Sequence, residues 1–201
     1  MGRISVTENR MLMAQARESL KGKWGLAVGT FVVFMVVAGF AQVVPFVGAI
    51  ISIIISGPVT LGWAVFSLAL ARDDNARLEM IFDGFRMFGT ALGAYLLAGL
   101  FVFLWSLLLI VPGIIAALAY SQMYYILAED KTIGAFEVIR KSKEMMVGNK
   151  GKFFCLGVRF LGWALLCILT LGIGFLWLCP YVAVATAKFY DDIREAPSAA
   201  A

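Results

Sequence analysis

Cysteines and paired acidic residues are the side chains of this chain whose types and spacing could do chemistry. Cysteine thiolates bind soft metals or attack substrates, and neighbouring carboxylates bind divalent cations. Cys155, Cys167 and Cys179 are evenly spaced, no two of them form a C-x-x-C pair, and the chain contains no histidine. We therefore interpret the cysteines as small buried apolar residues. The expected protein is not an enzyme and holds no metal and no cofactor.

The acidic pairs lie where apolar runs end. They are Asp73-Asp74, Glu129-Asp130 and Asp191-Asp192. A charge costs little where a helix leaves the bilayer. We therefore interpret the pairs as solvated boundary markers rather than as catalytic groups or ligands.

Four polar residues inside apolar runs are the candidates for an intramembrane polar site. Arg159 is the one basic residue well inside such a run, and Gln42, Tyr120 and Gln122 are uncharged polar residues in other runs. An arginine inside the bilayer is unfavourable by a few kcal/mol unless it pairs or snorkels. Arg159 could line a cavity for an anionic group, or it could snorkel to the near interface. The sequence leaves both interpretations open.

Prolines and glycines inside the runs could shape the helices. Pro58 and Pro180 are expected to kink two of them, and kinked helices either build transporter sites or only adjust packing. Small residues four apart let helices approach closely. This spacing occurs at Gly25-x-x-x-Gly29 and Gly89-x-x-x-Gly93.

Long apolar runs are the elements that position these residues. Of the 201 residues, 62% are hydrophobic and 15% are charged, and the mean hydropathy is +0.90. In an ordinary soluble domain about a quarter of the residues are charged. The first run is also too long for the apolar region of a signal peptide. We therefore expect an uncleaved anchor and a membrane protein.

Six apolar spans fit the sequence. Each must be a helix, because lipid offers no partners for backbone N–H and C=O groups. The expected fold is an all-α membrane protein with six transmembrane helices arranged as three helical hairpins. The spans run over residues 25–44, 46–71, 87–111, 112–128, 153–171 and 172–190.

Uncharged turns are expected to close the hairpins. Residues 87–128 would be about 63 Å long as one helix, which is about twice the thickness of the hydrocarbon core. The stretch must therefore cross twice. Proline fixes φ and glycine permits unusual φ, so Pro112 and Gly113 are predicted to form the sharp turn. The same reasoning places the other two turns at Pro45 and Gly172.

Basic residues are absent from the three turns and gather between the hairpins and near the termini. The positive-inside rule then places both termini in the cytoplasm. The net charge of +4 is interpreted as topology-determining residues that contact membrane lipids, not as a nucleic-acid site. The predicted location is the bacterial cytoplasmic (inner) membrane.

A threefold internal repeat is also predicted. Gly22, Gly84 and Gly148 recur at intervals of about 60 residues, each between a stretch with helical spacing and a span. These stretches are expected to be amphipathic helices at the cytoplasmic interface, either simple connectors or sites for lipids or partners. Ser5-x-x-Glu8 fits a capping box for the first. The parallel repeats are residues 7–74, 75–130 and 132–192 of a single domain, 1–195, followed by a disordered tail at 196–201.

The order of several segments resembles a known family. They read ARESLKGKW, WSLLLIVPGIIAALAYSQMYYILAED, IRKSKEMMVGNKGKFF, FLGWALL and WLCPYVAVATAKFYDDI. Together they resemble the bacterial membrane proteins grouped as domain of unknown function nine-seven-five, over nearly the whole chain. The resemblance implies a six-span membrane protein without an assigned activity. A more distant similarity is to the membrane portion of some glycerophosphodiester phosphodiesterases, whose catalytic residues have no counterpart here.

Two functions follow from these expectations. The first is a non-enzymatic structural, regulatory or protective role, exerted through the cytoplasmic helices on a membrane-protein partner or a second copy of the chain. The alternative is a small transporter or lipid-handling protein with an axial cavity between the repeats.

Overall fold

The chain is helical throughout the part that the structure describes. The structure is a computed structural model that describes residues 4–40 and 47–195, and these residues contain no strand. The elements are α1 (Asn9–Leu20), α2 (Trp24–Phe40), α3 (Val47–Ala71), α4 (Met80–Asp83), η2 (Gly84–Met87), α5 (Phe88–Leu108), α6 (Ile110–Tyr120), α7 (Met123–Glu129), α8 (Ala135–Met145), α9 (Lys150–Leu169) and α10 (Phe175–Glu195).

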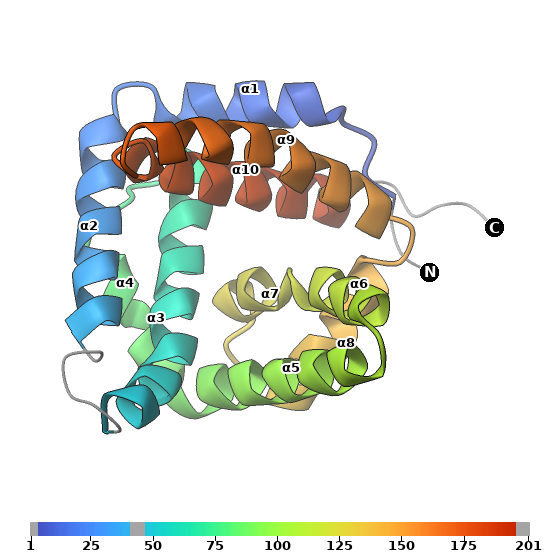
Figure 1. Cartoon of the computed structure of the whole chain (residues 1–201). Helices are drawn as coiled ribbons and strands as arrows, with labels where there is room; N and C mark the ends of the chain where they lie inside the picture. The colour runs from blue at the N-terminus through green and yellow to red at the C-terminus, as the bar shows by residue number, and fades with distance from the viewer. Residues whose placement is uncertain (1–3, 41–46, 196–201) are drawn as a thin grey trace.

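Helix α3 lies at the centre of the molecule. It packs against α1, α2, α4, η2, α5, α7 and α10. In Figure 1, α1, α9 and α10 lie along the top, α5, α6 and α8 lie toward the bottom, and α2 and α3 run between the two groups. The core between these helices is apolar and closely filled, with Phe66, Leu70 and Phe189 fully buried.

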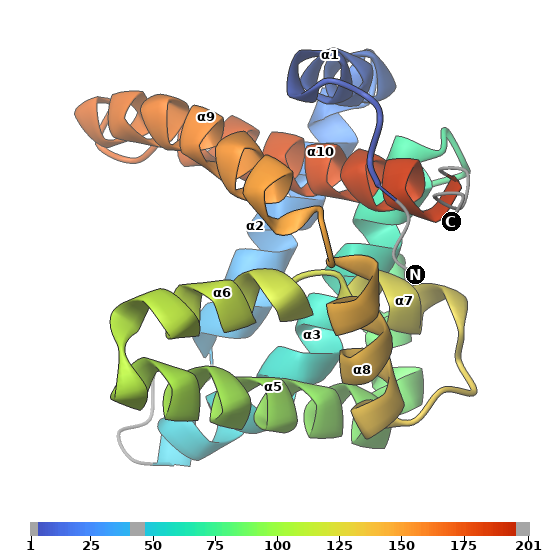
Figure 2. The ribbon, with the colours of Figure 1, turned by 90° about the vertical axis from the view of Figure 1, so that its right-hand side faces the viewer.

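The ends of the hairpins lie on opposite sides of the molecule. In Figure 2 the α5–α6 and α9–α10 turns are on the left, and the C-terminal ends of α3, α7 and α10 are on the right. The right-hand side is the charged one, because each of these three helices is followed by, or ends in, an acidic pair. This arrangement is the one expected when uncharged turns and charged connections lie at opposite membrane faces.

Within residues 4–40 and 47–195, four helical stretches are long and apolar enough to cross a membrane: Ile50–Ala71, Met80–Leu108, Ile110–Glu129 and Lys150–Leu169. A fifth crossing is counted if α1 and α2, which are bent by 95° at their junction, form one broken span. The predicted sixth span differs because α10 begins only at Phe175. Every stretch of α10 long enough to cross therefore includes Lys188, Asp191 and Asp192.

The turn between α5 and α6 lies three residues before the predicted one. Leu109 alone breaks the helix, with an extended backbone (φ −163°, ψ 149°). Pro112 and Gly113 lie inside the first turn of α6, so the prediction of a Pro-Gly turn is wrong. Proline is tolerated there because the first N–H groups of a helix have no partner within it. Gly113 instead allows α6 to approach α5 closely, since a Cβ at position 113 would overlap the hydroxyl of Ser106 on α5.

The turn between α9 and α10 contains Gly172, as predicted. The N–H of Gly172 donates to the carbonyl of Cys167 (3.0 Å), and the N–H of Leu171 donates to that of Ile168 (3.1 Å). This pair of bonds is a Schellman ending, in which the residue after the cap is left-handed. Here that residue is Leu171 (φ 53°), followed by Gly172 (φ 87°). The remaining predicted turn residue, Pro45, lies outside the described residues.

Leu171→Gly is expected to stabilise the protein by about 0.5–1 kcal/mol. Leucine is strained by roughly 1–2 kcal/mol in the left-handed region, and the flexibility of glycine in the unfolded chain offsets part of the gain. Leu171 is 94% exposed, so no packing within the chain is lost. The midpoint of thermal unfolding in detergent should rise. Gly172→Ala should lower it, and a rise for both variants would contradict this account.

The three glycines of the predicted repeat are not equivalent. Gly22 (φ 76°) and Gly148 (φ 81°) are both left-handed and separate a linker helix from a span. Gly84 is right-handed (φ −61°) and continues from α4 into η2. Its place is set by packing, because a Cβ on Gly84 would overlap the carbonyl oxygen of Pro58 on α3. The threefold repeat stays a prediction.

Close backbone contact occurs at other glycines than those predicted. Gly25, Gly29 and Gly89 have open space where a Cβ would be, whereas a Cβ on Gly93 would lie 3.1 Å from the Cβ of Ala135 on α8. Gly62 of α3 instead faces the backbone of Ile81 so closely that a Cβ would overlap its carbonyl group. A Cβ on Gly57, on the same helix, would lie 2.7 Å from the carbonyl oxygen of Ala91. Together with Gly84, these residues hold α3 against α4, η2 and α5.

Candidate functional site

The residues predicted to form an intramembrane site are not brought together. Arg159 lies on an exposed position of α9 and forms no ion pair with a described residue. Gln122 is fully buried before α7, and its Nε2 donates to Ser121 Oγ (3.1 Å). Tyr120 is partly buried at the end of α6 beside Phe101 (ring centroids 6.2 Å apart).

The remaining sequence-predicted positions divide into two groups. Gln42 lies outside the described residues, as does the tail at 196–201. Pro58 and Pro180 do lie inside helices, α3 and α10 respectively, and both are buried. Their kinks and their part in a site stay predictions.

An ion-pair junction joins the C-terminal ends of three helices instead. Glu129, the last residue of α7, accepts hydrogen bonds from Arg72 after α3 and from Arg194 in α10. Its second oxygen accepts one from the hydroxyl of Tyr190 at 2.6 Å. Glu129 thus ties the second hairpin to both of the others.

Arg72 completes the junction by bridging two acids. Its Nη2 donates to Asp191 Oδ1 at 2.6 Å as well as to Glu129. Partial burial acts to lower the pKa of the Arg72 guanidinium, but the hydrogen bonds and charges of Asp191 and Glu129 outweigh it and raise the pKa. The side chains of Arg72, Glu129 and Asp191 are 31%, 23% and 15% exposed. They are therefore partly shielded from solvent, which strengthens the pairing.

A second polar cluster fastens the N-terminal segment to the same end of the molecule. Asp192 accepts hydrogen bonds from the hydroxyls of Ser5 and Thr7. Lys152 Nζ donates to Ser5 Oγ (2.6 Å) and lies 3.9 Å from Asp192. Ser5 N–H donates to Asn149 Oδ1 (2.8 Å). The predicted capping box is wrong, because α1 begins at Asn9 with no side-chain cap and Ser5 serves this cluster instead.

Asp192→Asn is expected to lower the free energy of unfolding by about 1–2 kcal/mol and to loosen the N-terminal segment, since it removes the charge that faces Lys152. Limited proteolysis of the purified protein should cut within residues 4–8 faster. Asp74→Asn is the matched control, because Asp74 is exposed. Equal cleavage of both variants would show that Asp192 does not hold the segment.

The acidic pairs therefore have three different roles, and only some members are solvated boundary residues. Asp73 is exposed, is left-handed (φ 58°) at the end of α3, and pairs with Lys23, whose hydrogen bond and charge lower the pKa of Asp73. Asp130 is hydrogen bonded to Thr132, which lowers the pKa of Asp130. Glu129, Asp191 and Asp192 are structural partners rather than solvated markers. Among the described residues, no group of three or more His, Cys, Asp or Glu could hold a metal ion.

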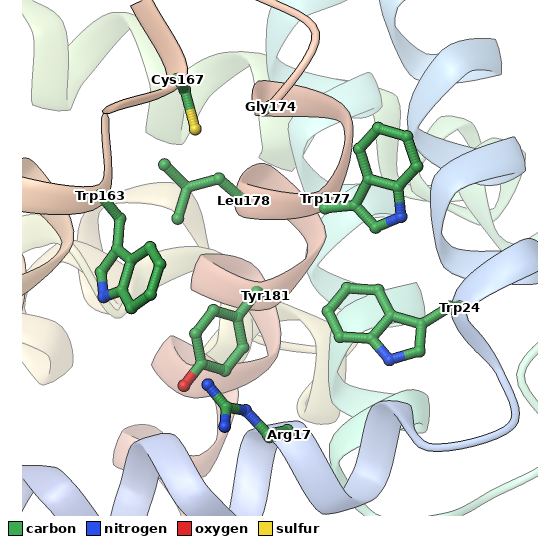
Figure 3. Close-up of a pocket in the computed structure, with 8 residues that line it drawn as sticks. All are labelled: Arg17, Trp24, Trp163, Cys167, Gly174, Trp177, Leu178 and Tyr181. Carbon is green, nitrogen blue, oxygen red and sulfur yellow. The ribbon is translucent and has the colours of Figure 1, made fainter. Parts of the chain in front are cut away.

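An aromatic pocket lies between the first linker helix and the third hairpin. Its volume is about 190 Å³. Figure 3 shows Arg17 and the Tyr181 hydroxyl together at one end and Cys167 with Gly174 at the other. The Tyr181 hydroxyl donates to the Met13 carbonyl (3.0 Å), which fixes α1 along α10. The wall between the two ends consists of Trp24, Trp163, Trp177 and Leu178.

A family model matches nearly the whole chain. The model, described as a protein of unknown function (DUF975), matches residues 6–117 and residues 106–197. The chain belongs to the DUF975 family. No curated protein and no solved structure shows significant similarity to it. The resemblance to DUF975 is confirmed, and the similarity of this DUF975 chain to phosphodiesterase membrane domains stays a prediction.

Two features of this DUF975 chain were missed by reasoning from the sequence. Arg72 is one of the basic residues between the hairpins, and nothing in the charge pattern predicts its ion pairs, although it directly precedes an acidic pair at the end of a span. Arg17 and Trp24 belong to a stretch that is expected to be either a connector or a site for lipids or partners, and the sequence predicts no role for Trp163 and Trp177. No sequence pattern shows that α1 lies against α10, so the pocket could not be found without the fold.

Proposed function

We propose that the protein is a non-enzymatic component of the bacterial cytoplasmic membrane with a structural or regulatory role. The observation that carries this proposal is that the partly buried carboxylates are held in ion pairs and hydrogen bonds within the protein. Glu129 and Asp191 are engaged by arginines, and Asp192 by two hydroxyls and a lysine. Carboxylates held in this way stabilise an arrangement of helices and are poorly placed to exchange protons with a substrate.

The proposed topology has six crossings and both termini in the cytoplasm. It is supported by the attachment of Ser5 and Thr7 to Asp192, which puts the start of the chain beside the end of α10. It is also supported by the gathering of basic residues at this end. The proposed crossings by α2 and α10 are the two that helix length and composition alone do not support.

The proposed point of action is α8. Val138, Ile139 and Ser142 are buried, and the Ser142 hydroxyl donates to the Ala119 carbonyl (2.9 Å), which anchors the helix on α6. The opposite side presents Phe136, which is 66% exposed, and α8 is followed by Val147, which is 56% exposed. Apolar side chains among charged ones at a cytoplasmic surface are suited to bind a membrane-protein partner or a second copy of the chain.

A cross-linking experiment tests this function. A photoreactive amino acid replaces Phe136 in living cells, and Leu171 in the opposite turn is the matched control because it is also highly exposed. One defined adduct from position 136 and none from position 171 is the expected result. The purified protein in liposomes should also transport no more solute than protein-free liposomes. Robust uptake together with no adduct would overturn the proposal.

The alternative function, a small transporter or lipid-handling protein, is favoured by one observation. Gln122 Oε1 is buried without a hydrogen-bond partner, and such orphaned groups are uncommon and often functional. Arg159 does not lie with it, so this version rests on Gln122 alone. Loss of a measured flux in Gln122→Leu, with unchanged folding, would decide for transport.

A further inference from the structure

The aromatic pocket at Arg17 has a counterpart elsewhere in the molecule. A second pocket, of about 270 Å³, is lined by Trp105, Tyr120, Lys143 and Lys150 together with apolar residues of α6. It lies between the second hairpin and the linker helix of the third unit. The first pocket lies between the third hairpin and the linker helix of the first unit.

The two pockets use the same positions of the chain. Arg17 and Lys143 each precede a left-handed glycine, Gly22 or Gly148, by five residues. Trp24 and Lys150 each follow the same glycine by two residues. In both cases the linker helix brings a cation to a hairpin that supplies tryptophan and tyrosine. Because the same positions relative to Gly22 and Gly148 line both pockets, the pockets are a recurring feature of the fold rather than accidental gaps between helices.

Arg17 lies in hydrogen-bond contact with the Tyr181 hydroxyl, but the cations in both pockets have no acidic partner in the part of the chain that the structure describes. Among the described residues, no carboxylate forms an ion pair with Arg17, Lys143 or Lys150. By contrast, Lys21, Arg72, Arg140 and Arg194 are ion paired. Both pockets therefore present positive charge that no described carboxylate pairs with.

The shape of the first pocket fits an amphiphile. Figure 3 shows that its cation lies at one end, with tryptophan rings and Leu178 leading away from it toward Cys167. Trp163 and Trp177 are 50% and 49% exposed, so the groove opens to the membrane side of α9 and α10. Ligand pockets of about 300–1,000 Å³ enclose a whole small molecule. A volume of about 190 Å³ is enough only for part of one.

We propose that both pockets bind an anionic phospholipid of the surrounding bilayer. The phosphate lies at Arg17 in the first pocket and at Lys143 and Lys150 in the second, and one acyl chain of each lipid lies along the tryptophan-lined wall. Anionic headgroups are attracted to basic residues at the cytoplasmic leaflet, and tryptophan and tyrosine are suited to the same depth.

A third site is absent from the described residues for a physical reason. The residue five before Gly84 is Glu79, which would repel a phosphate. Gly84 is also not left-handed, and η2 packs directly on the backbone of α3. The space that the other two units leave for a ligand is filled here by the protein itself. The proposal therefore predicts two lipids, not three.

Native mass spectrometry of the purified protein with phosphatidylglycerol and phosphatidylcholine of identical chains tests the proposal. The wild type should retain up to two phosphatidylglycerol molecules and at least tenfold less phosphatidylcholine. Arg17→Gln should retain one, Lys143→Gln with Lys150→Gln should retain one, and the combined variant none. Arg17→Lys should keep two. The matched controls are Arg10→Gln and Lys141→Gln, on the same linker helices but outside the pockets, and both should retain two.

A second measurement keeps the proposal testable if a variant folds poorly. Phosphatidylglycerol with brominated chains should quench the tryptophan fluorescence of the wild type, and soluble glycerol phosphate should neither quench it nor displace the lipid. Equal retention of the two lipids, equal losses in Arg17→Gln and Arg10→Gln, or displacement by glycerol phosphate alone would overturn the proposal. Equal retention of the two lipids would mean that lipid binds without headgroup specificity. Displacement by glycerol phosphate would mean that the site binds a soluble phosphate.

Discussion

Gly62→Ala should prevent stable folding of this protein. A Cβ at position 62 would overlap the carbonyl group of Ile81, and backbone atoms of α4 cannot move aside as a flexible side chain can. Overpacking costs roughly 1–3 kcal/mol when side chains can adjust, and here the two helix backbones must separate. We expect a loss of about 3 kcal/mol or more, which is a large part of the roughly 5–15 kcal/mol that stabilises a typical protein.

The measurement is the yield of monodisperse protein after extraction from membranes, together with its midpoint of thermal unfolding. Gly84→Ala should behave in the same way, because its Cβ would overlap the carbonyl oxygen of Pro58. Gly99→Ala is the matched control, since nothing lies within 4 Å of the position of its Cβ. Normal yield and stability of Gly62→Ala would show that α3 and α4 are not in contact.

Glu129→Gln is the second substitution expected to have a large effect. It removes one acidic partner from each of two arginines and weakens the bond from Tyr190. Arg72 then keeps Asp191, and Arg194 keeps Asp191 and Glu195. Breaking a fully buried pair costs about 3–5 kcal/mol, and breaking an exposed one costs about 0–1 kcal/mol. The Glu129 side chain is 23% exposed, so we expect a loss of about 1–3 kcal/mol.

The thermal midpoint in detergent measures this loss. Glu137→Gln removes the same charge from an exposed pair with Arg140 and should change stability by less than about 0.5 kcal/mol. Removing Arg194 together with Glu129 should recover part of the loss, because Asp191 then faces Arg72 without a second arginine beside it. If both Glu129→Gln and Glu137→Gln leave the midpoint unchanged, the junction does not stabilise the contact between hairpins.

The class of the fold could be predicted from the sequence because it depends on composition. Apolar runs near Leu61 or Leu100 have only one stable form in lipid, the helix. The turn at Leu109 could not be predicted in the same way. The pair Pro112-Gly113 has the composition of a turn, but proline also suits the first turn of a helix. The choice between them depends on how α6 packs against Ser106 of α5.

The candidate site was only partly predictable, for a related reason. Arg159 stands out in the sequence because it is charged and surrounded by apolar residues, but its orientation depends on the rotation of α9, which places it on the surface. Arg17 is inconspicuous among the charges of α1. Its role follows from the contact between α1 and α10, which lie at opposite ends of the chain. Periodicity reports which residues share a helix face, and not which helix that face meets.

The attachment of Ser5 and Thr7 to Asp192 has a consequence for biosynthesis. Ser5 and Thr7 are translated well before Asp192, from which they are separated by 187 and 185 residues. Helix α1 therefore has no α10 to pack against until α10 has been synthesised and folded. A nascent chain stalled before α10 should leave residues 4–8 open to quality-control proteases, and their attachment to Asp192 reports that α1 and α10 have come together.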